Sequence, residues 1–174
     1  MSKKKQIGSL YRDLQKVNNI VQGEQYVRKA GEIVWTAARE SVSRTAWKYS
    51  TGELAQSIEM KVEKGSEQVV AHIGTNLDYA PYIEFGTGQE GAQSSAQTSP
   101  DVSVTYSLAP WWIHKDMVDP AASEAYGWFK HGDFQKVNGQ PAKPFLYPAV
   151  KNNEQLIADT LVGGWEEAIR RATK

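Results

Sequence analysis

The sequence predicts an α+β protein, with an antiparallel sheet of about four strands packed by a long N-terminal helix and a C-terminal helix. Three observations support this class. Apolar residues recur at helical spacing over residues 24–48, alternate with polar residues over 56–74, and recur at helical spacing again over 148–171. The resulting order of helix, hairpin, strand, insertion, strand and helix is typical of a sheet covered by helices.

A chain of 174 residues is expected to form a single domain. We therefore treat residues 1–174 as one α+β domain, with an insertion at 89–138 before the last strand. The insertion has a polar part at 89–109, expected to be a loop or arm, and an aromatic-rich part at 111–137.

The N-terminal half begins with two helical patterns. Residues 9–21 carry Leu and Val at helical spacing, and residues 24–48 form the main amphipathic helix. Ser50-Thr51-Gly52-Glu53 then has the spacing of a capping box, which predicts a short helical turn through Leu54.

Strands are predicted on either side of the insertion. Residues 56–74 form a β-hairpin, because apolar and polar residues alternate on both sides of the turn Lys64-Gly65-Ser66. Residues 79–85 form a third short strand that leaves through Gly86 and Gly88. Phe145 and Leu146 belong to the last strand.

Helix and turn signals also occur in the insertion and near the C-terminus. Asp119-Pro120 predicts a short helix over 120–125, and His131-Gly132-Asp133 turns a small hairpin between Trp128 and Val137. Pro148 fits the first turn of the C-terminal helix, and Gly163-Gly164 predicts a bend in it.

Composition excludes several classes of site. The 20 basic and 20 acidic residues cancel, which argues against a broad nucleic-acid-binding face. The absence of cysteine excludes disulfides, thiolate metal sites and cysteine nucleophiles. The lysines at 3–5 are not followed by an apolar run, and no segment is long enough to span a membrane, so we expect a protein made in the cytoplasm without a signal peptide.

No catalytic, cofactor-binding or metal-binding residue is predicted. His72, His114 and His131 have no partner at metal-ligand spacing, and Gly86-Thr87-Gly88 lacks the lysine and the further glycines of a phosphate-binding loop.

Glu84 could belong to a hydrolase site together with Asp78 or Asp101, but no feature of the sequence specifies such a pair. Strand alternation would place Glu84 on the sheet face opposite Ile83 and Phe85. We therefore interpret it as an exposed or interface charge, paired with a basic residue or with turn amides.

Trp111, Trp112 and Trp128 mark the aromatic-rich part of the insertion. Two interpretations compete on equal terms: the rings fold back as a small additional core, or they form a protein interface. Stacking on sugars is a third alternative. Single-stranded nucleic acid is disfavoured, because the nearby lysines are few and balanced by acids.

Several motifs occur in a fixed order along the chain. Thr51-Gly52-Glu53-Leu54 and Ser57-Ile58 are followed by Tyr79-Ala80-Pro81-Tyr82-Ile83-Glu84-Phe85-Gly86-Thr87-Gly88, then by Lys143-Pro144-Phe145-Leu146-Tyr147-Pro148-Ala149. This ordered set resembles the tail-component family of long-tailed bacteriophages, also called neck, head–tail joining or tail-completion proteins, and is similar in pattern to minor tail protein Z of lambda-like phages. The resemblance covers residues 24–88 and 139–172.

The resemblance implies a non-enzymatic virion protein of the neck or tail. Such proteins form homo-oligomeric rings, here six-fold or twelve-fold, between the connector or head-closure protein and the tail terminator or tail-tube proteins. Packaged DNA would pass through the ring without sequence-specific contact. In this interpretation Tyr82, Glu84, Phe85, Gly86 and Thr87 shape the exit from the sheet, and Phe145 and Pro148 anchor the return strand. The alternative is a carbohydrate- or protein-binding module that uses the Trp-rich insertion.

Overall fold

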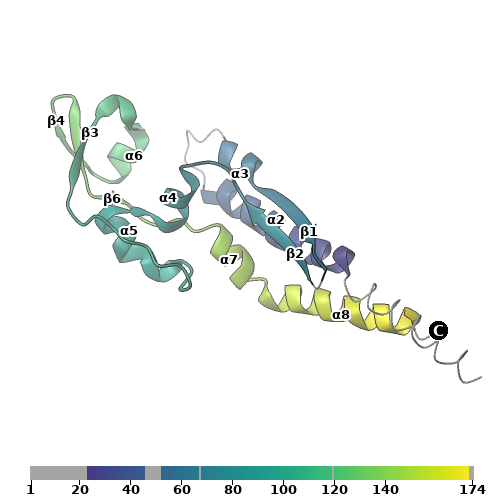
Figure 1. The fold of residues 1–174 in the computed structure, drawn as a ribbon. Helices are drawn as coiled ribbons and strands as arrows, with labels where there is room; N and C mark the ends of the chain where they lie inside the picture. The colour runs from purple at the N-terminus through teal and green to yellow at the C-terminus, as the bar shows by residue number, and fades with distance from the viewer. Residues whose placement is uncertain (1–22, 46–51, 67, 119, 173–174) are drawn as a thin grey trace, which may run out of the picture. The chain divides into compact units, whose positions relative to one another are not determined.

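A computed structural model describes residues 23–45, 52–66, 68–118 and 120–172 (Figure 1). The described chain is a mixture of helices and antiparallel strands, with a long helix near its start and another at its end, so the α+β class is confirmed. The predicted helix over 9–21 and the capping Ser50 lie outside the described residues.

The chain divides into two compact units. The first comprises Met1–Thr36, Met60–Ile73 and Asn152–Lys174, and the second comprises Ala37–Glu59 and Gly74–Lys151. Each is described by itself below.

The long helix predicted from residue 24 is α2, Glu24–Thr45. Its buried residues recur every four positions, as an amphipathic helix requires. They are Tyr26, Ala30, Val34, Ala38 and Val42.

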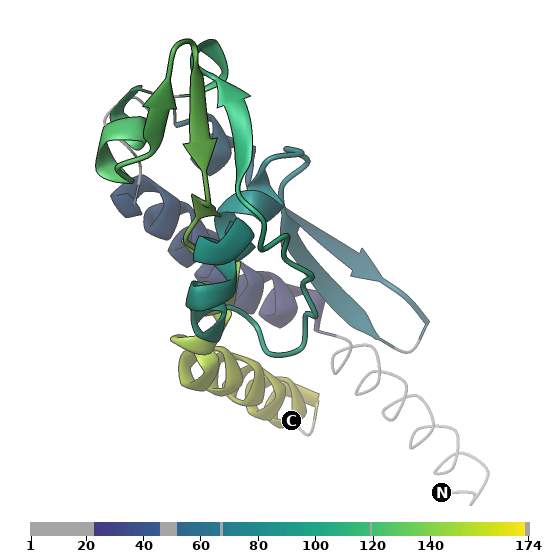
Figure 2. The same cartoon turned by 90° about the vertical axis from the view of Figure 1, so that its left-hand side faces the viewer.

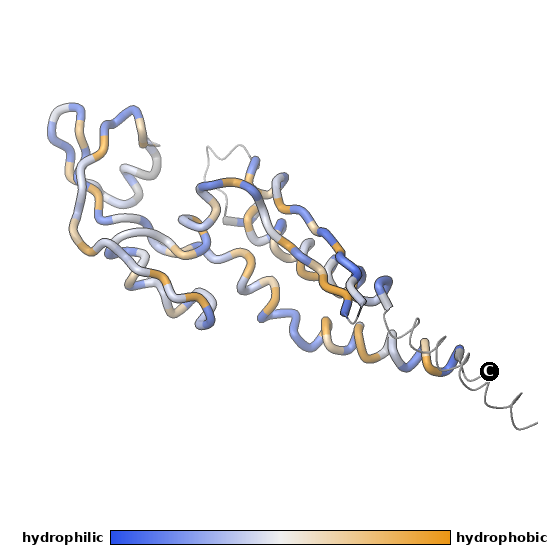
Figure 3. The backbone as a smooth tube through the Cα atoms, viewed as in Figure 1, coloured by the Kyte–Doolittle hydropathy of each residue, from blue (hydrophilic) through white to orange (hydrophobic). Residues whose placement is uncertain are grey.

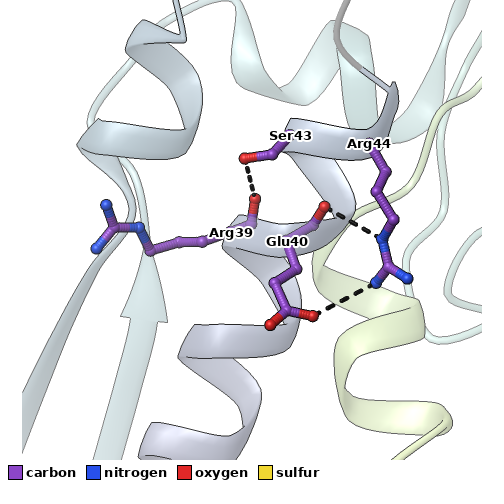
Figure 4. Close-up of polar contacts among 4 residues, drawn as sticks. All are labelled: Arg39, Glu40, Ser43 and Arg44. Atoms are coloured by element: carbon purple, nitrogen blue, oxygen red, sulfur yellow. Dashed lines mark hydrogen bonds and ion pairs between the residues drawn. The ribbon is translucent and has the colours of Figure 1, made fainter.

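The opposite side of α2 is polar. Arg28 forms an ion pair with Glu24 at 3.0 Å, and Arg44 lies 3.7 Å from Glu40, each at i,i+4 spacing. Near the end of the helix the Ser43 hydroxyl donates to the Arg39 carbonyl oxygen at 2.9 Å (Figure 4).

The first unit contains the predicted hairpin and the last helix. Strands β1, Glu59–Lys64, and β2, Val69–Gly74, pair in a two-stranded sheet. Their short connection requires them to be antiparallel, because parallel strands need a crossover of a dozen or more residues. The hairpin predicted over 56–74 is therefore confirmed.

Close packing in the first unit occurs at two glycines. A Cβ at Gly31 of α2 would lie 2.7 Å from the Met60 sulfur and 3.1 Å from the Ala71 Cβ, so α2 packs directly on the hairpin. Gly164 of α8, Glu154–Ala172, lies against the ring of Tyr26. The bend predicted at Gly163-Gly164 is wrong: α8 is helical through both residues, and Gly164 permits this close contact instead.

The second unit contains the remaining elements. Its helices are α3 (Glu53–Ser57), α4 (Ala80–Phe85), α5 (Gly88–Ser94), α6 (Pro120–Ala125) and α7 (Leu146–Lys151), with 3₁₀ turns at Ser95–Gln97 and Lys115–Met117. Its strands are β3 (Trp111–His114), β4 (Phe129–His131), β5 (Phe134–Val137) and the two-residue β6 (Gly139–Gln140). Phe145 and Ile58 are the largest fully buried side chains there.

The strands form two small sheets rather than one sheet of about four strands. Besides the β1-β2 hairpin, β3, β5 and β4 form a three-stranded antiparallel sheet within the insertion (Figure 2). The helix predicted over 120–125 and the hairpin predicted between Trp128 and Val137 are both confirmed. The sheet was missed because β3 is contributed by Trp111–His114, which has no clear alternation.

The strand predicted over 79–85 is wrong, because Ala80–Phe85 is helix α4. Pro81 lies in the first turn of this helix, where its missing amide costs no hydrogen bond. Ala80 and Glu84 are the buried residues, at the i,i+4 spacing of a helix. Gly86, with φ of 73°, then ends the helix.

The return strand predicted at Phe145 and Leu146 is also wrong. Residues 141–145 belong to no strand, and Leu146 begins α7, with Pro148 in its first turn. The helix predicted from Pro148 to residue 171 is therefore two helices, α7 and α8, separated at Asn152 and Asn153. The polar part of the insertion is helical at its start, over α5 and the following 3₁₀ turn, and has no regular structure from 98 to 110 apart from turns and bends.

Candidate functional site

The carboxylate of Glu84 is the centre of the second unit's polar structure. It is 5% exposed and accepts three backbone hydrogen bonds, from the amides of Phe145 at 2.6 Å, Leu146 at 3.0 Å and Tyr147 at 3.0 Å. These amides precede and begin α7, where a helix leaves its first amides without intrahelical partners. Glu84 therefore caps α7 from a position far away in the sequence.

Backbone carbonyls of the same helix, α4, hold the returning chain along its length. The Ile83 carbonyl oxygen accepts from the Lys143 amide at 2.8 Å, and the Tyr82 carbonyl oxygen accepts from the Gln140 side chain at 2.9 Å. The Phe85 carbonyl oxygen accepts from the hydroxyl of Tyr106 at 2.9 Å.

Beyond α4, residues 87–94 continue the contact with the returning chain. Thr87 and Gly88 form antiparallel bridges with Gln140 and Gly139, and the Thr87 hydroxyl accepts from the Gln140 amide at 3.1 Å. The Ser94 hydroxyl accepts from the Ala142 amide at 2.7 Å. We call these paired segments, 82–94 and 138–147, the clamp.

Glycines allow the two segments of the clamp to approach closely. Gly86 and Gly139 have φ values of 73° and 100°, which other residues rarely adopt. A Cβ at Gly86 would lie 2.6 Å from the Ala142 nitrogen and 2.7 Å from the Gln140 carbonyl oxygen. A Cβ at Gly139 would overlap the Thr87 carbonyl oxygen. The glycines of the motif thus permit backbone contact rather than phosphate binding.

The clamp closes the base of the insertion, whose three-stranded sheet carries an exposed aromatic face. Side chains two apart on a strand, and those in register across strands, share a face. By this rule one face consists of Trp112 and His114 on β3, Phe134 and Lys136 on β5, and Phe129 and His131 on β4. We call these six residues the aromatic face.

The rings of the aromatic face contact one another edge to face. The ring centroids of Trp112 and Phe129 are 6.2 Å apart, those of Trp112 and His131 are 6.3 Å apart, and those of His114 and Phe134 are 5.3 Å apart. Trp112, Phe129 and Phe134 nevertheless remain 49%, 63% and 50% exposed. The face therefore combines ring contacts within the sheet with a large exposed aromatic surface.

The opposite face of this sheet is partly covered. Gln135 and Val137 are buried there, and the Ser123 hydroxyl on α6 donates to the Gln135 side-chain oxygen at 2.5 Å. Trp111 alternates with Trp112 and so lies on this side, while Trp128 stacks on Tyr126 with centroids 5.3 Å apart. Trp111 and Trp112 are therefore both exposed, on opposite faces of the sheet, and Trp128 is half-buried against Tyr126.

The predicted motif residues lie in or beside the clamp. Glu84, Gly86, Thr87 and Phe145 meet in the clamp, and the side chain of Tyr82 is 57% exposed beside it. Phe85 contributes its carbonyl oxygen, and Pro148 lies in the helix that Glu84 caps.

The sequence suggested turn amides as partners of Glu84 but did not indicate that they begin a helix far along the chain. Of the aromatic face, the predicted site residues include only Trp112 and lack His114, Phe129, His131, Phe134 and Lys136. The period-two spacing of Phe129 with His131 and of Phe134 with Lys136, on either side of a Gly turn, is the signal that could have found the last four of these.

The electrostatics of the second unit are modest. Burial lowers the pKa of Lys143, and burial together with the Glu90 carboxylate raises the pKa of Tyr126. Burial, followed by the charge of Glu53 and a hydrogen bond with it, raises the pKa of Tyr79.

No group of three or more metal-ligating side chains occurs among the described residues. Both oxygens of Glu84 are engaged by backbone amides, so its observed geometry is that of a structural cap. Within the described ranges no helix is both long and apolar enough to cross a membrane.

Comparison with known proteins gives one match. Residues 8–86 match the model of a family described as "Bacteriophage HK97-gp10, putative tail-component". Neither the curated proteins nor the solved structures include a significant match to the chain. The matched segment ends at Gly86, so it contains α4, including Glu84, but neither the rest of the clamp nor the insertion. The resemblance to a bacteriophage tail-component family that the motifs predicted is therefore confirmed over residues 8–86.

Proposed function

We propose that this protein is a structural component of a bacteriophage virion, located in the neck or tail, and that it is not an enzyme. The match of residues 8–86 to a tail-component family carries the proposal. The structural role of Glu84 agrees with it, because the one carboxylate buried in the motif caps a helix.

In its finer form, the proposal is a homo-oligomeric ring, six-fold or twelve-fold, that joins or completes head and tail. Its neighbours would be the connector or head-closure protein on one side and the tail terminator or tail-tube proteins on the other, with DNA passing through the ring. The clamp supports this form, because it holds both ends of an insertion whose aromatic side chains are exposed. Exposed Trp and Phe side chains are typical of the cores of protein interfaces.

Deleting the gene from the phage that carries it tests the proposal. We expect filled heads and finished tails that fail to join, or tails of defective completion, seen by negative-stain microscopy. The wild-type gene supplied in trans should restore joined particles, and purified protein should form rings by itself or with the connector or tail-tube proteins. Normal, infectious particles without the gene product would contradict the virion role.

One observation favours a second candidate, a carbohydrate-binding module. Trp112 and Phe129 expose ring surface on one face of a small sheet, where sugar rings could stack. A glycan array probed with the wild-type protein and Trp112→Ala tests this candidate. Binding lost in Trp112→Ala but retained in Met117→Ala, a change at an 80% exposed residue outside the aromatic face, would support it. An array without binding would exclude it.

A further inference from the structure

We propose that the ring closes by contact between two different surfaces: the aromatic face of one copy binds the outer stripe of α8 on the next copy. We define the outer stripe as Ala158, Val162, Trp165 and Ile169. This inference rests on the proposed ring and specifies which surfaces form it.

The outer stripe is an exposed apolar surface of α8. Its four residues follow one another at spacings of four, three and four, which places them on one side of a helix. Val162, Trp165 and Ile169 are 49%, 45% and 48% exposed, whereas Gly164 and Ala168, about a quarter turn round the helix, are buried. Apolar and polar residues accordingly alternate along α8 (Figure 3).

Charge makes this stripe complementary to the aromatic face. Residues 154–169 of α8 contain four carboxylates and no lysine or arginine, and Arg170 and Arg171 follow in its last turn, where Arg171 forms an ion pair with Glu167. The carboxylates are Glu154, Asp159, Glu166 and Glu167. By helical geometry Asp159 and Glu166 flank the stripe on one side, next to Val162 and Trp165.

The aromatic face has the opposite character. Lys136 lies between Trp112 and Phe129 in register, His114 and His131 flank Phe134, and none of the six residues is acidic. Two carboxylates lie at its edge: Asp133 forms an ion pair with Lys115 at 2.7 Å, and Asp116 lies 3.3 Å from His114. The aromatic face thus carries one lysine and no carboxylate, so an apolar surface with carboxylates at its margin, such as the outer stripe, fits it.

A second copy of this chain is the occupant we infer, because both complementary surfaces belong to the same chain. Pairing of two identical aromatic faces would bring Lys136 against its own counterpart, whereas pairing of unlike faces brings opposite charges together. Unlike faces give a head-to-tail contact, and contacts of this kind generate closed rings when the rotation between copies permits.

Mixing two variants of the full chain tests the inference. Phe129→Asp places a charge on the aromatic face, and Trp165→Asp places one on the outer stripe; both side chains are exposed, so the fold should persist by circular dichroism. Each variant alone should self-associate about tenfold more weakly or worse, since each buries a charge in an apolar contact. Mixed 1:1, they should form a heterodimer and no ring. The aromatic face of the Trp165→Asp variant and the outer stripe of the Phe129→Asp variant are the one intact pair of surfaces.

Sedimentation velocity of each variant, the mixture and the wild type distinguishes the outcomes. Met117→Asp and Leu156→Asp are the matched controls, because both change exposed apolar residues outside the two surfaces, and they should leave the wild-type assembly unchanged. If the variants assemble like the wild type, or if the mixture stays monomeric, the proposed pair of surfaces is wrong. The proposed ring is not contradicted by either result. A wild-type protein that is monomeric at every concentration would instead overturn the ring itself. If a variant self-assembles normally but no longer binds a tail-tube protein, the changed surface binds that protein and not a second copy, which would overturn the inference.

Discussion

The carboxylate of Glu84 accepts a hydrogen bond of 2.6 Å from the backbone amide of Phe145, 61 residues later in the chain. Glu84 ends up in this position because α4 turns it inward beside Ala80, and Phe145 is 1% exposed at the point where the chain returns. One acidic side chain therefore joins the motif at 79–88 to the motif at 143–149, and so holds together the two segments on either side of the insertion.

Replacing this carboxylate should destabilise the protein. Glu84→Gln keeps the shape but exchanges one acceptor oxygen for a donor nitrogen, which leaves at least one buried amide without an acceptor. We expect a loss of about 1–3 kcal/mol in the free energy of unfolding, measured by urea denaturation. Glu124→Gln, at an exposed position on α6, is the control and should change it little. Equal stability of both variants would contradict the capping role.

Sequence periodicity predicted the elements whose stabilising contacts are local. The buried stripe of α2, the β1-β2 hairpin and the α6 helix after Asp119-Pro120 all follow from spacing or turn chemistry within a few residues. Their apolar patterns are long or their start signals are specific, so the sequence alone was sufficient.

The clamp could not be predicted in the same way. Ala80–Phe85 is only six residues long, and over so short a stretch apolar residues at alternate positions fit a strand as well as a helix. The role of Glu84 depends on amides more than sixty residues away, for which the local sequence has no signal. The prediction that Glu84 pairs with backbone amides is confirmed, whereas the prediction that its side chain is exposed is wrong.

The clamp also predicts unequal effects at two glycines. Gly139→Ala should be strongly destabilising, because a φ of 100° costs a non-glycine residue about 1–2 kcal/mol and the new Cβ overlaps the Thr87 carbonyl oxygen. Overpacking of this kind adds about 1–3 kcal/mol. Gly127 has a φ of 60° but nothing within 4 Å of an added Cβ, so only the conformational cost applies to Gly127→Ala. Thermal denaturation compares the two, and similar melting temperatures would contradict the close contact.

Two adjacent glycines of α8 should respond in opposite directions. A Cβ added at Gly163 would have no atom within 4 Å, so Gly163→Ala should stabilise the helix by about 1 kcal/mol through helix propensity. Gly164→Ala places a methyl group in the ring of Tyr26 and should destabilise by about 1–3 kcal/mol. Urea denaturation measures both, and equal stabilisation by the two changes would show that α8 does not pack on Tyr26.

The pair Ser123 and Gln135 offers a test of the covered side of the three-stranded sheet. Both side chains are buried and joined by a hydrogen bond of 2.5 Å. Ser123→Ala leaves the Gln135 oxygen without its donor and should lower the free energy of unfolding by about 1–3 kcal/mol. Adding Gln135→Leu removes the unsatisfied polar group and should restore most of that free energy. Chemical denaturation of the two single variants and the double variant gives the coupling. Strict additivity would mean that the two side chains do not interact.

The environment of Tyr126 makes a prediction at alkaline pH. Burial, followed by the Glu90 carboxylate, raises the pKa of Tyr126 above its ordinary value of 10.0, so the folded state holds this proton more tightly than the unfolded state. Its contribution to stability is complete below about pH 10 and is lost as the pH rises through the folded-state pKa. Phenolate absorbance is titrated against pH in the wild type and in Tyr126→Phe, and the difference between the two curves isolates Tyr126. This difference curve should have its midpoint above pH 10.0. In Glu90→Gln that midpoint should move down, because the smaller of the two causes has been removed. A difference titration with its midpoint at or below 10.0 would show that the Tyr126 hydroxyl is not buried.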